Sequence, residues 1–164
     1  MQLQNPKRAV MFFLLGGVAL WLLLDWAIVT DKERIERAVR AMRDAAASAD
    51  AAALFEHVSP AYYDERLSAA QLRLLADDFF RASGPMTIRI RKLAVEISGE
   101  TAVAEVSMLA YGADDNSSNA TGTAAFLLDF RKEGRRWLVT QIVPLRVNGQ
   151  EIDGWGTLMK IGRF

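Results

Sequence analysis

The chain has 164 residues, with 20 basic and 20 acidic side chains, one histidine and no cysteine. This length allows one ordinary domain. The lack of cysteine excludes disulfides and thiolate nucleophiles, and the single His57 argues against a histidine-based zinc site. Nucleic-acid binding needs a surplus of clustered positive charge, which this balanced chain lacks. We therefore expect no nucleic-acid partner, no metal and no other cofactor.

The most apolar stretch, residues 9–29, reads "AVMFFLLGGVALWLLLDWAIV" and holds a single charge. About 20 such residues form a helix long enough to cross roughly 30 Å of hydrocarbon. We predict an uncleaved transmembrane helix, because no small-residue cleavage site follows it. Lys7 and Arg8 precede the span. The positive-inside rule then leaves residues 1–8 in the cytoplasm and puts residues 30–164 outside it, in the periplasm if the source is bacterial.

The one charge in this span is Asp25. At about 1.5 Å per residue it lies roughly 24 Å along the helix, near the outer boundary of the membrane. Trp21 and Trp26 flank it as an aromatic belt would. The alternative is that Asp25 pairs with a cation on another helix, since membrane charges are often paired and functional. Gly16 and Gly17 would let such a helix approach closely, although they lack the four-residue repeat of dimer motifs.

Three helices are predicted after the span. The sequence "TDKE" at 30–33 has the form of a capping box. It precedes an apolar stripe at helical spacing: Ile35, Val39, Met42 and Ala46. Asp50 is expected to cap a second, short helix that ends before Pro60. "SAAQ" at 68–71 forms another capping box. The apolar side of the helix it opens comprises Leu72, Leu75, Phe79 and Phe80.

The apolar period changes from 3.6 to 2 after Pro85, which predicts strands. The alternation slips by one residue near Lys92 and so predicts a β-bulge. Three further strand-like stretches are joined by loops of hairpin length: "AVAEVSMLAYG", "ATGTAAFLLDFRK" and "RWLVTQIVPLRV". Helices followed by strands indicate an α+β fold. We predict about three helices covering one face of a curved antiparallel sheet of four or more strands.

This order of elements, with "LFEHVSPAYYDE" after the first helix and "RRWLVTQI" in the last strand, resembles the nuclear transport factor 2-like superfamily. That superfamily includes the SnoaL-like and ketosteroid-isomerase-like proteins, and the resemblance covers residues 30–147. It implies a cone-shaped domain with a pocket, used variously for isomerisation, dehydration, ligand binding or dimerisation. An early hairpin found in many members is here reduced to "SPAYYDE". Such a fold does not by itself give a function.

Enzymes of this superfamily need an acid or base in an apolar pocket. Two strand carboxylates, Glu105 and Asp129, are predicted on the solvent side, because the opposite face of each strand is more apolar. His57, Tyr62 and Asp64, with Tyr63 beside them, form a candidate acid–base group near the pocket mouth that the resemblance implies. Ordinary structural roles are favoured for them, and no family catalytic residue matches a position here.

Seven basic residues could gather on the sheet: Arg89, Arg91, Lys92, Arg131, Lys132, Arg135 and Arg136. A solvated face balanced by nearby glutamates is favoured. If they did cluster, they would suit an anionic partner or lipid headgroups.

Three hypotheses for function follow. The leading one is a membrane-anchored, extracytoplasmic accessory domain without enzymatic activity, which associates with other membrane subunits or with a second copy. The second is a SnoaL-like enzyme or binder of a small hydrophobic ligand. The third is an obligate subunit whose interface lies in the membrane, at Gly16, Gly17, Trp21, Asp25 and Trp26.

Overall fold

The computed structural model describes residues 30–64, 67–112 and 122–152. The chain divides after Thr30 into two units, and every described helix and strand belongs to the second unit, Asp31–Phe164. In the described part of the chain, no helix is both long enough and apolar enough to cross a membrane. The predicted span at residues 9–29, with its glycines, tryptophans and Asp25, lies outside the described residues and stays a prediction.

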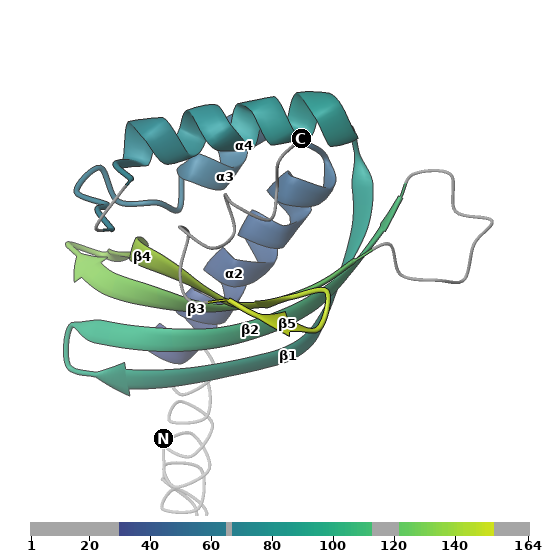
Figure 1. The fold of residues 1–164 in the computed structure, drawn as a ribbon. Coiled ribbons are helices and arrows are strands. Elements are labelled where there is room, and N and C mark those ends of the chain that lie inside the picture. The colour runs from purple at the N-terminus through teal and green to yellow at the C-terminus, as the bar shows by residue number, and fades with distance from the viewer. Residues whose placement is uncertain (1–29, 65–66, 113–121, 153–164) are drawn as a thin grey trace, which may run out of the picture. The chain divides into compact units, whose positions relative to one another are not determined.

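The second unit is built on one antiparallel sheet in which each strand pairs only with its sequence neighbours (Figure 1). The strands in order are β1 (Met86–Ser98), β2 (Thr101–Gly112), β3 (Gly122–Glu133), β4 (Arg136–Val147) and β5 (Gln150–Glu151). Three helices lie on one face of this curved sheet: α2 (Asp31–Ala47), α3 (Ala51–Phe55) and α4 (Ala69–Ser83). The predicted α+β architecture is confirmed, with β5 as a short fifth strand.

Helix α2 begins directly after Thr30, where the first capping box was predicted. Its predicted apolar stripe is buried at Ile35, Val39 and Met42, and it packs on β1 and β4. The last position of the stripe differs, because Ala45 is buried whereas Ala46 is only partly covered. The stripe therefore turns slightly around the helix as it follows the twisted sheet.

Both later caps form as the sequence predicts. The Ala53 N–H donates to the Asp50 carboxylate at 2.9 Å, at the start of α3. At the start of α4, the Gln71 N–H donates to the Ser68 hydroxyl at 3.4 Å, and the Ser68 N–H donates to the Gln71 amide oxygen at 2.9 Å. These bonds satisfy N–H groups that the first turn of a helix leaves without partners.

The predicted apolar side of α4 is only half buried. Leu72 and Phe80 are covered, but Leu75 is 44% and Phe79 is 51% exposed. The four residues lie on the apolar side of the helix that was predicted, but the domain covers only two of them. The physical reason is that α4 packs on α3, a helix of five residues, which is too short to cover the whole apolar arc of its neighbour.

Bulges bend the sheet toward the helices. The register between β1 and β2 shifts between Ile90 and Lys92, as predicted, and the β3–β4 pair contains two further shifts. A bulge adds a residue to one strand and increases its local twist.

The segment after α3 pairs with the edge of β4. The Val139 N–H donates to the His57 carbonyl at 2.9 Å, and the Ser59 N–H donates to the Val139 carbonyl at 2.8 Å.

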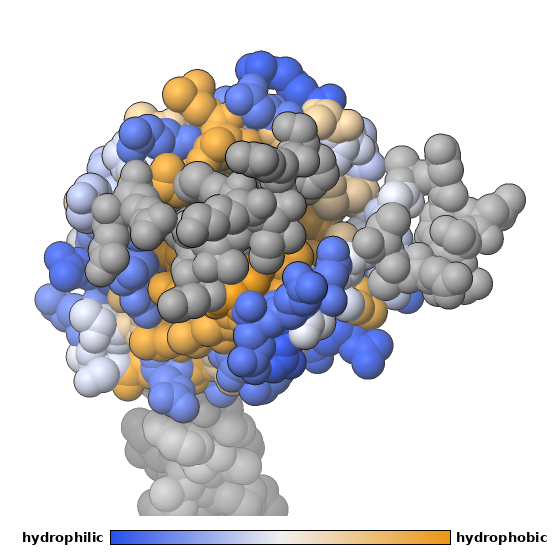
Figure 2. Space-filling view, viewed as in Figure 1, coloured by the Kyte–Doolittle hydropathy of each residue, from blue (hydrophilic) through white to orange (hydrophobic). Residues whose placement is uncertain are grey.

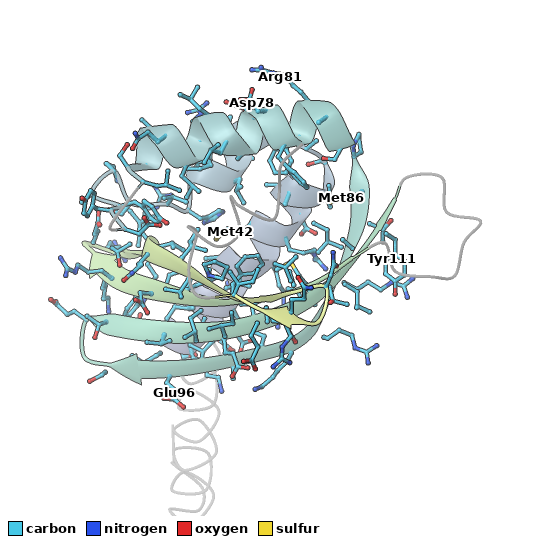
Figure 3. The ribbon with its side chains drawn as sticks, in the orientation of Figure 1. Met42, Asp78, Arg81, Met86, Glu96 and Tyr111 are labelled. Atoms are coloured by element: carbon cyan, nitrogen blue, oxygen red, sulfur yellow. The ribbon has the colours of Figure 1, made fainter. Side chains whose placement is uncertain are left out.

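Large apolar side chains fill the space between the helices and the sheet. Phe130, Val139 and Trp137 from the strands meet Ile35 and Met42 from α2 in one buried cluster. Figure 3 shows Met42 on the inner side of α2, facing the sheet. The inner face of the sheet thus serves as the core of the domain.

Candidate functional site

Two of the sequence-predicted candidates, Tyr62 and Asp64, form a buried pair. The Tyr62 hydroxyl donates to Asp64 Oδ2 at 3.1 Å, and both side chains are almost wholly covered. The other carboxylate oxygen, Oδ1, accepts the Leu67 N–H at 2.9 Å. A carboxylate that accepts a backbone N–H three residues later stabilises a turn. The hydrogen-bonded pair therefore stabilises the turn between α3 and α4.

His57 and Tyr63 have different surroundings from that pair. Tyr63 is 67% exposed. His57 is partly buried; this burial lowers its pKa, the Arg136 cation lowers it further, and Glu56 acts in the opposite direction. The Arg136 guanidinium also donates to the Glu56 carbonyl at 2.6 Å. His57 is thus held toward its neutral form at the edge of β4.

Sequence analysis missed a charged cluster at the start of α2. The Lys132 ammonium donates to Asp31 Oδ2 at 2.7 Å and lies 5.6 Å from the centre of the Trp137 ring. The hydrogen bond from Lys132 lowers the pKa of Asp31, and the neighbouring Trp137 lowers it further, although its buried indole N–H makes no hydrogen bond within the described residues. An anion in the first turn of a helix is also favoured by the helix dipole. The cluster fastens α2 to β3 and β4.

The two strand carboxylates lie on the outer face of the sheet, as predicted. Glu105 accepts a hydrogen bond from Lys92 at 2.8 Å and keeps 41% of its side chain exposed. Asp129 is half-buried, and this partial burial raises its pKa. The inner neighbours Ala104, Val106 and Phe130 are buried. Neither carboxylate faces the interior, where proton-transfer chemistry in this superfamily would take place.

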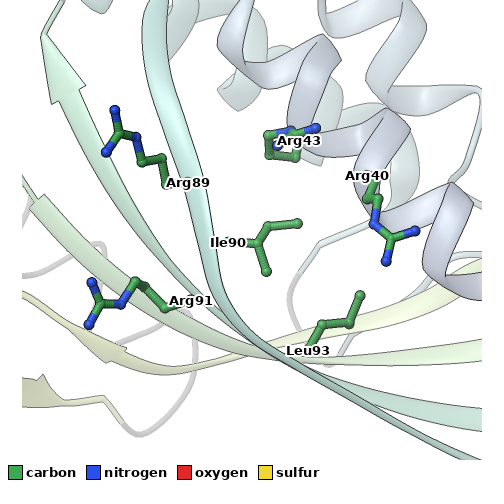
Figure 4. Close-up of a pocket in the computed structure, with 6 residues that line it drawn as sticks. All are labelled: Arg40, Arg43, Arg89, Ile90, Arg91 and Leu93. Carbon is green, nitrogen blue, oxygen red and sulfur yellow. The ribbon is translucent and has the colours of Figure 1, made fainter.

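The basic residues of the sheet do not form one cluster. Lys92 pairs with Glu105, Lys132 with Asp31, and Arg136 with a backbone carbonyl. Arg89 and Arg91 instead share a hollow of about 530 Å³ with Arg40 and Arg43 of α2. Figure 4 shows Ile90 and Leu93 between the two pairs of arginines. No sequence pattern joins positions so far apart, so this grouping could not be predicted.

A second surface feature is the exposed apolar side of α4. Leu75 and Phe79 are one helical turn apart and both are about half exposed. We call these two residues the α4 stripe. Figure 2 shows hydrophobic surface over α4, and Figure 3 places the ion pair of Asp78 and Arg81 on the outward side of the same helix. A metal site is not formed in the described ranges, where no three His, Asp or Glu side chains come together.

Solved structures with the same fold are found in several bacteria. A protein of unknown function with a cystatin-like fold from Nostoc punctiforme is 12% identical, with a TM-score of 0.61, and the match covers 70% of this chain and 89% of that one. A putative dehydratase of the NTF2-like family from Streptomyces avermitilis is 12% identical, with a TM-score of 0.57, over 68% and 92% of the two chains. At these identities the similarity shows the fold alone.

A third similar structure is a putative calcium/calmodulin-dependent protein kinase type II association domain from Thiobacillus denitrificans. It is 12% identical, with a TM-score of 0.56, and the match covers 68% of this chain and 94% of that one. No curated protein sequence matches the chain.

The helices on one face of a curved antiparallel sheet define an NTF2-like domain, as the resemblance of the sequence predicted. The family model of the SnoaL-like domain matches residues 35–143, which spans α2 to β4. The chain therefore belongs to the SnoaL-like domain family. Members of one fold carry unrelated functions, so the function is argued below from the surfaces of this chain.

Proposed function

We propose that this chain is a membrane-anchored, extracytoplasmic accessory domain that binds another protein through the α4 stripe. The partner would be a subunit of a membrane complex or a second copy of the chain. The observation that carries the proposal is the exposure of Leu75 and Phe79 on a well-capped helix. Burying apolar surface stabilises association by about 25 cal/mol per Å² removed from water.

The neighbouring residues favour a contact surface over a loosely packed helix. Leu72 and Phe80 fasten α4 to the domain, and the capping box fixes its first turn. The stripe is therefore held on a rigid element, and ordering it on binding costs little entropy. The Asp78 and Arg81 pair on the same helix supplies the polar rim that association surfaces usually have.

Anchoring and orientation rest on the amino-terminal sequence. Residues 9–29 have the length and composition of a membrane span, and Lys7 and Arg8 favour a cytoplasmic start. Association is also the role named for the Thiobacillus denitrificans protein with this fold. The apolar amino-terminal segment and this similarity together support an accessory role at a membrane.

The experiment compares variants of the full chain extracted in a mild detergent. Leu75→Ser with Phe79→Ser should lose the co-purifying partner or the dimer, as judged by mass and composition on size separation. Leu74→Ser is the matched control, because Leu74 is 64% exposed and lies about 100° around the same helix from Leu75. A wild-type chain that runs as a free monomer without partners would contradict the proposal.

The membrane segment offers a separate test. Asp25→Leu should leave the anchor intact, because it makes the span more apolar. Loss of the partner in this variant, with the α4 stripe intact, would assign the contact to the membrane helix at Asp25.

A second candidate function is an enzyme or small-ligand binder that uses Tyr62 and Asp64. The observation that favours it is the buried hydrogen bond of 3.1 Å between the Tyr62 phenol and the Asp64 carboxylate, because general acid–base catalysis uses a proton donor and an acceptor within such a distance. A dehydratase role is named for the Streptomyces avermitilis protein with this fold. Tyr62→Phe, which keeps the ring but removes the hydroxyl, should abolish ligand binding or turnover in a screen of the full chain. Unchanged binding or turnover would exclude a role for the hydroxyl.

A further inference from the structure

The hollow between α2 and β1 is lined by four arginines and two apolar side chains and by no acidic residue. Arg40 and Arg43 come from one helix, and Arg89 and Arg91 from the edge strand of the sheet. Cations gathered in one hollow repel one another unless something nearby compensates their charge.

The partners within the chain compensate the four cations only in part. Arg40 pairs with Glu36 at 3.0 Å, one turn earlier on α2. Arg43 Nε lies 2.7 Å from Asp44 but makes no hydrogen bond with it, although this nitrogen is buried. In each pair one side chain is exposed and the other is partly buried, and ion pairs this close to solvent are weak. A stronger anion can therefore take over both guanidiniums.

The two arginines of β1 have even fewer anionic neighbours. Arg89 lies over the Tyr111 ring, 5.4 Å from its centre, a contact that leaves its N–H donors available. For Arg91 no carboxylate of the described residues lies within ion-pair distance. Both side chains are exposed on the edge strand, where the hollow between β1 and α2 opens to solvent. Figure 4 shows them on the opposite side of Ile90 and Leu93 from Arg40 and Arg43.

We propose that this hollow binds a phosphate monoester whose organic part lies over Ile90 and Leu93. The planar guanidinium matches phosphate through two parallel hydrogen bonds. A volume of about 530 Å³ is within the range of small-molecule sites, and the apolar floor suits the carbon skeleton of an ester. The source is a soluble phosphate ester or the headgroup of a phosphate-bearing lipid, which present the same chemistry.

An acidic peptide added as a strand along β1 fits the same charges less well. Strand addition requires a regular ladder on the free edge. The bulge between Ile90 and Lys92 interrupts that ladder in the middle of the hollow, and basic side chains with a bulge are a common protection of a sheet edge. A concave surface with an apolar floor is better filled by a compact ligand.

The test uses the full chain in an uncharged detergent and isothermal titration calorimetry. The soluble probe is glycerol 1-phosphate. The lipid probe is phosphatidic acid in mixed micelles, compared with phosphatidylcholine in the same micelles. Binding of glycerol 1-phosphate assigns a soluble ligand, and binding of phosphatidic acid alone assigns a lipid headgroup. Either result supports the site.

Paired substitutions localise the binding. Arg89→Gln with Arg91→Gln should raise the Kd at least about tenfold, because charge-assisted hydrogen bonds are lost. Arg131→Gln with Arg135→Gln removes the same charge from two exposed positions outside the hollow, one in β3 and one in the turn between β3 and β4. This variant should change the Kd less than about twofold. Circular dichroism would verify that both variants are folded. Absence of binding to both probes, an equal loss in the control variant, or tighter binding of a short polyglutamate peptide would each overturn the proposal.

Discussion

Helices α2 and α4 are both amphipathic, yet the domain covers them to different extents. The apolar stripe of α2 is buried at Ile35, Val39 and Met42 against β1 and β4. Helix α4 buries Leu72 and Phe80 and leaves Leu75 and Phe79 half exposed. The difference teaches that α2 completes the core of the domain, whereas α4 leaves apolar surface uncovered, and this is the surface of the proposed contact.

The largest expected effect comes from a substitution in the buried apolar stripe of α2. Ile35→Ala should lower the free energy of unfolding by about 3 kcal/mol, because it leaves a cavity at a fully buried position. Leu75→Ala should lower it by less than about 1 kcal/mol, because that side chain is half exposed. Denaturant unfolding of the solubilised full chain, followed by tryptophan fluorescence, measures both. Equal losses would mean that α4 belongs to the core as much as α2 does.

A smaller effect is expected from loosening α4 at its first turn. Ser68→Ala should cost about 1 kcal/mol, because the Gln71 N–H loses its acceptor. Ser68→Asp keeps an acceptor there and serves as the control in the same unfolding experiment. If the aspartate variant lost as much stability as the alanine variant, the cap would not be what holds the first turn of α4.

The smallest effect concerns the attachment of α2 to the sheet and depends on pH. The pKa of Asp31 is lowered in the folded state, chiefly by the Lys132 hydrogen bond. The stabilisation is therefore complete above the unfolded pKa of about 3.9 and is lost as the pH falls through the folded value. Asp31→Asn should flatten the dependence of unfolding on pH in that window, and Lys132→Met should do the same. A full acid dependence in both variants would rule out this cluster as its source.

Local sequence signals predicted most of the fold. The capping box of Ser68 and Gln71, the cap at Asp50 and the bulge near Lys92 each depend on a few neighbouring residues, so they could be found without the structure. Alternation likewise placed Glu105 on the outer face.

The sites depend on contacts between distant residues and were harder to predict. Asp31 and Lys132 are 101 positions apart, and the arginines of α2 and β1 line one hollow only because α2 packs against the edge strand β1. The helical periodicity predicts which side of α4 is apolar. It does not predict how much of that side is buried, because the burial depends on the length of the neighbouring helix α3. Residue type indicates His57, Tyr62 and Asp64 as candidates, and of these three only Tyr62 and Asp64 are joined to each other by a described hydrogen bond.

The α4 stripe is tested most directly by photo-crosslinking in the native membrane. A photoreactive amino acid placed at Leu75 or at Leu74 in the full chain samples two sides of the same helix. The contact surface proposed here predicts a defined protein adduct from position 75 and little or none from position 74. Equal adducts from both positions, or none from position 75, would contradict it.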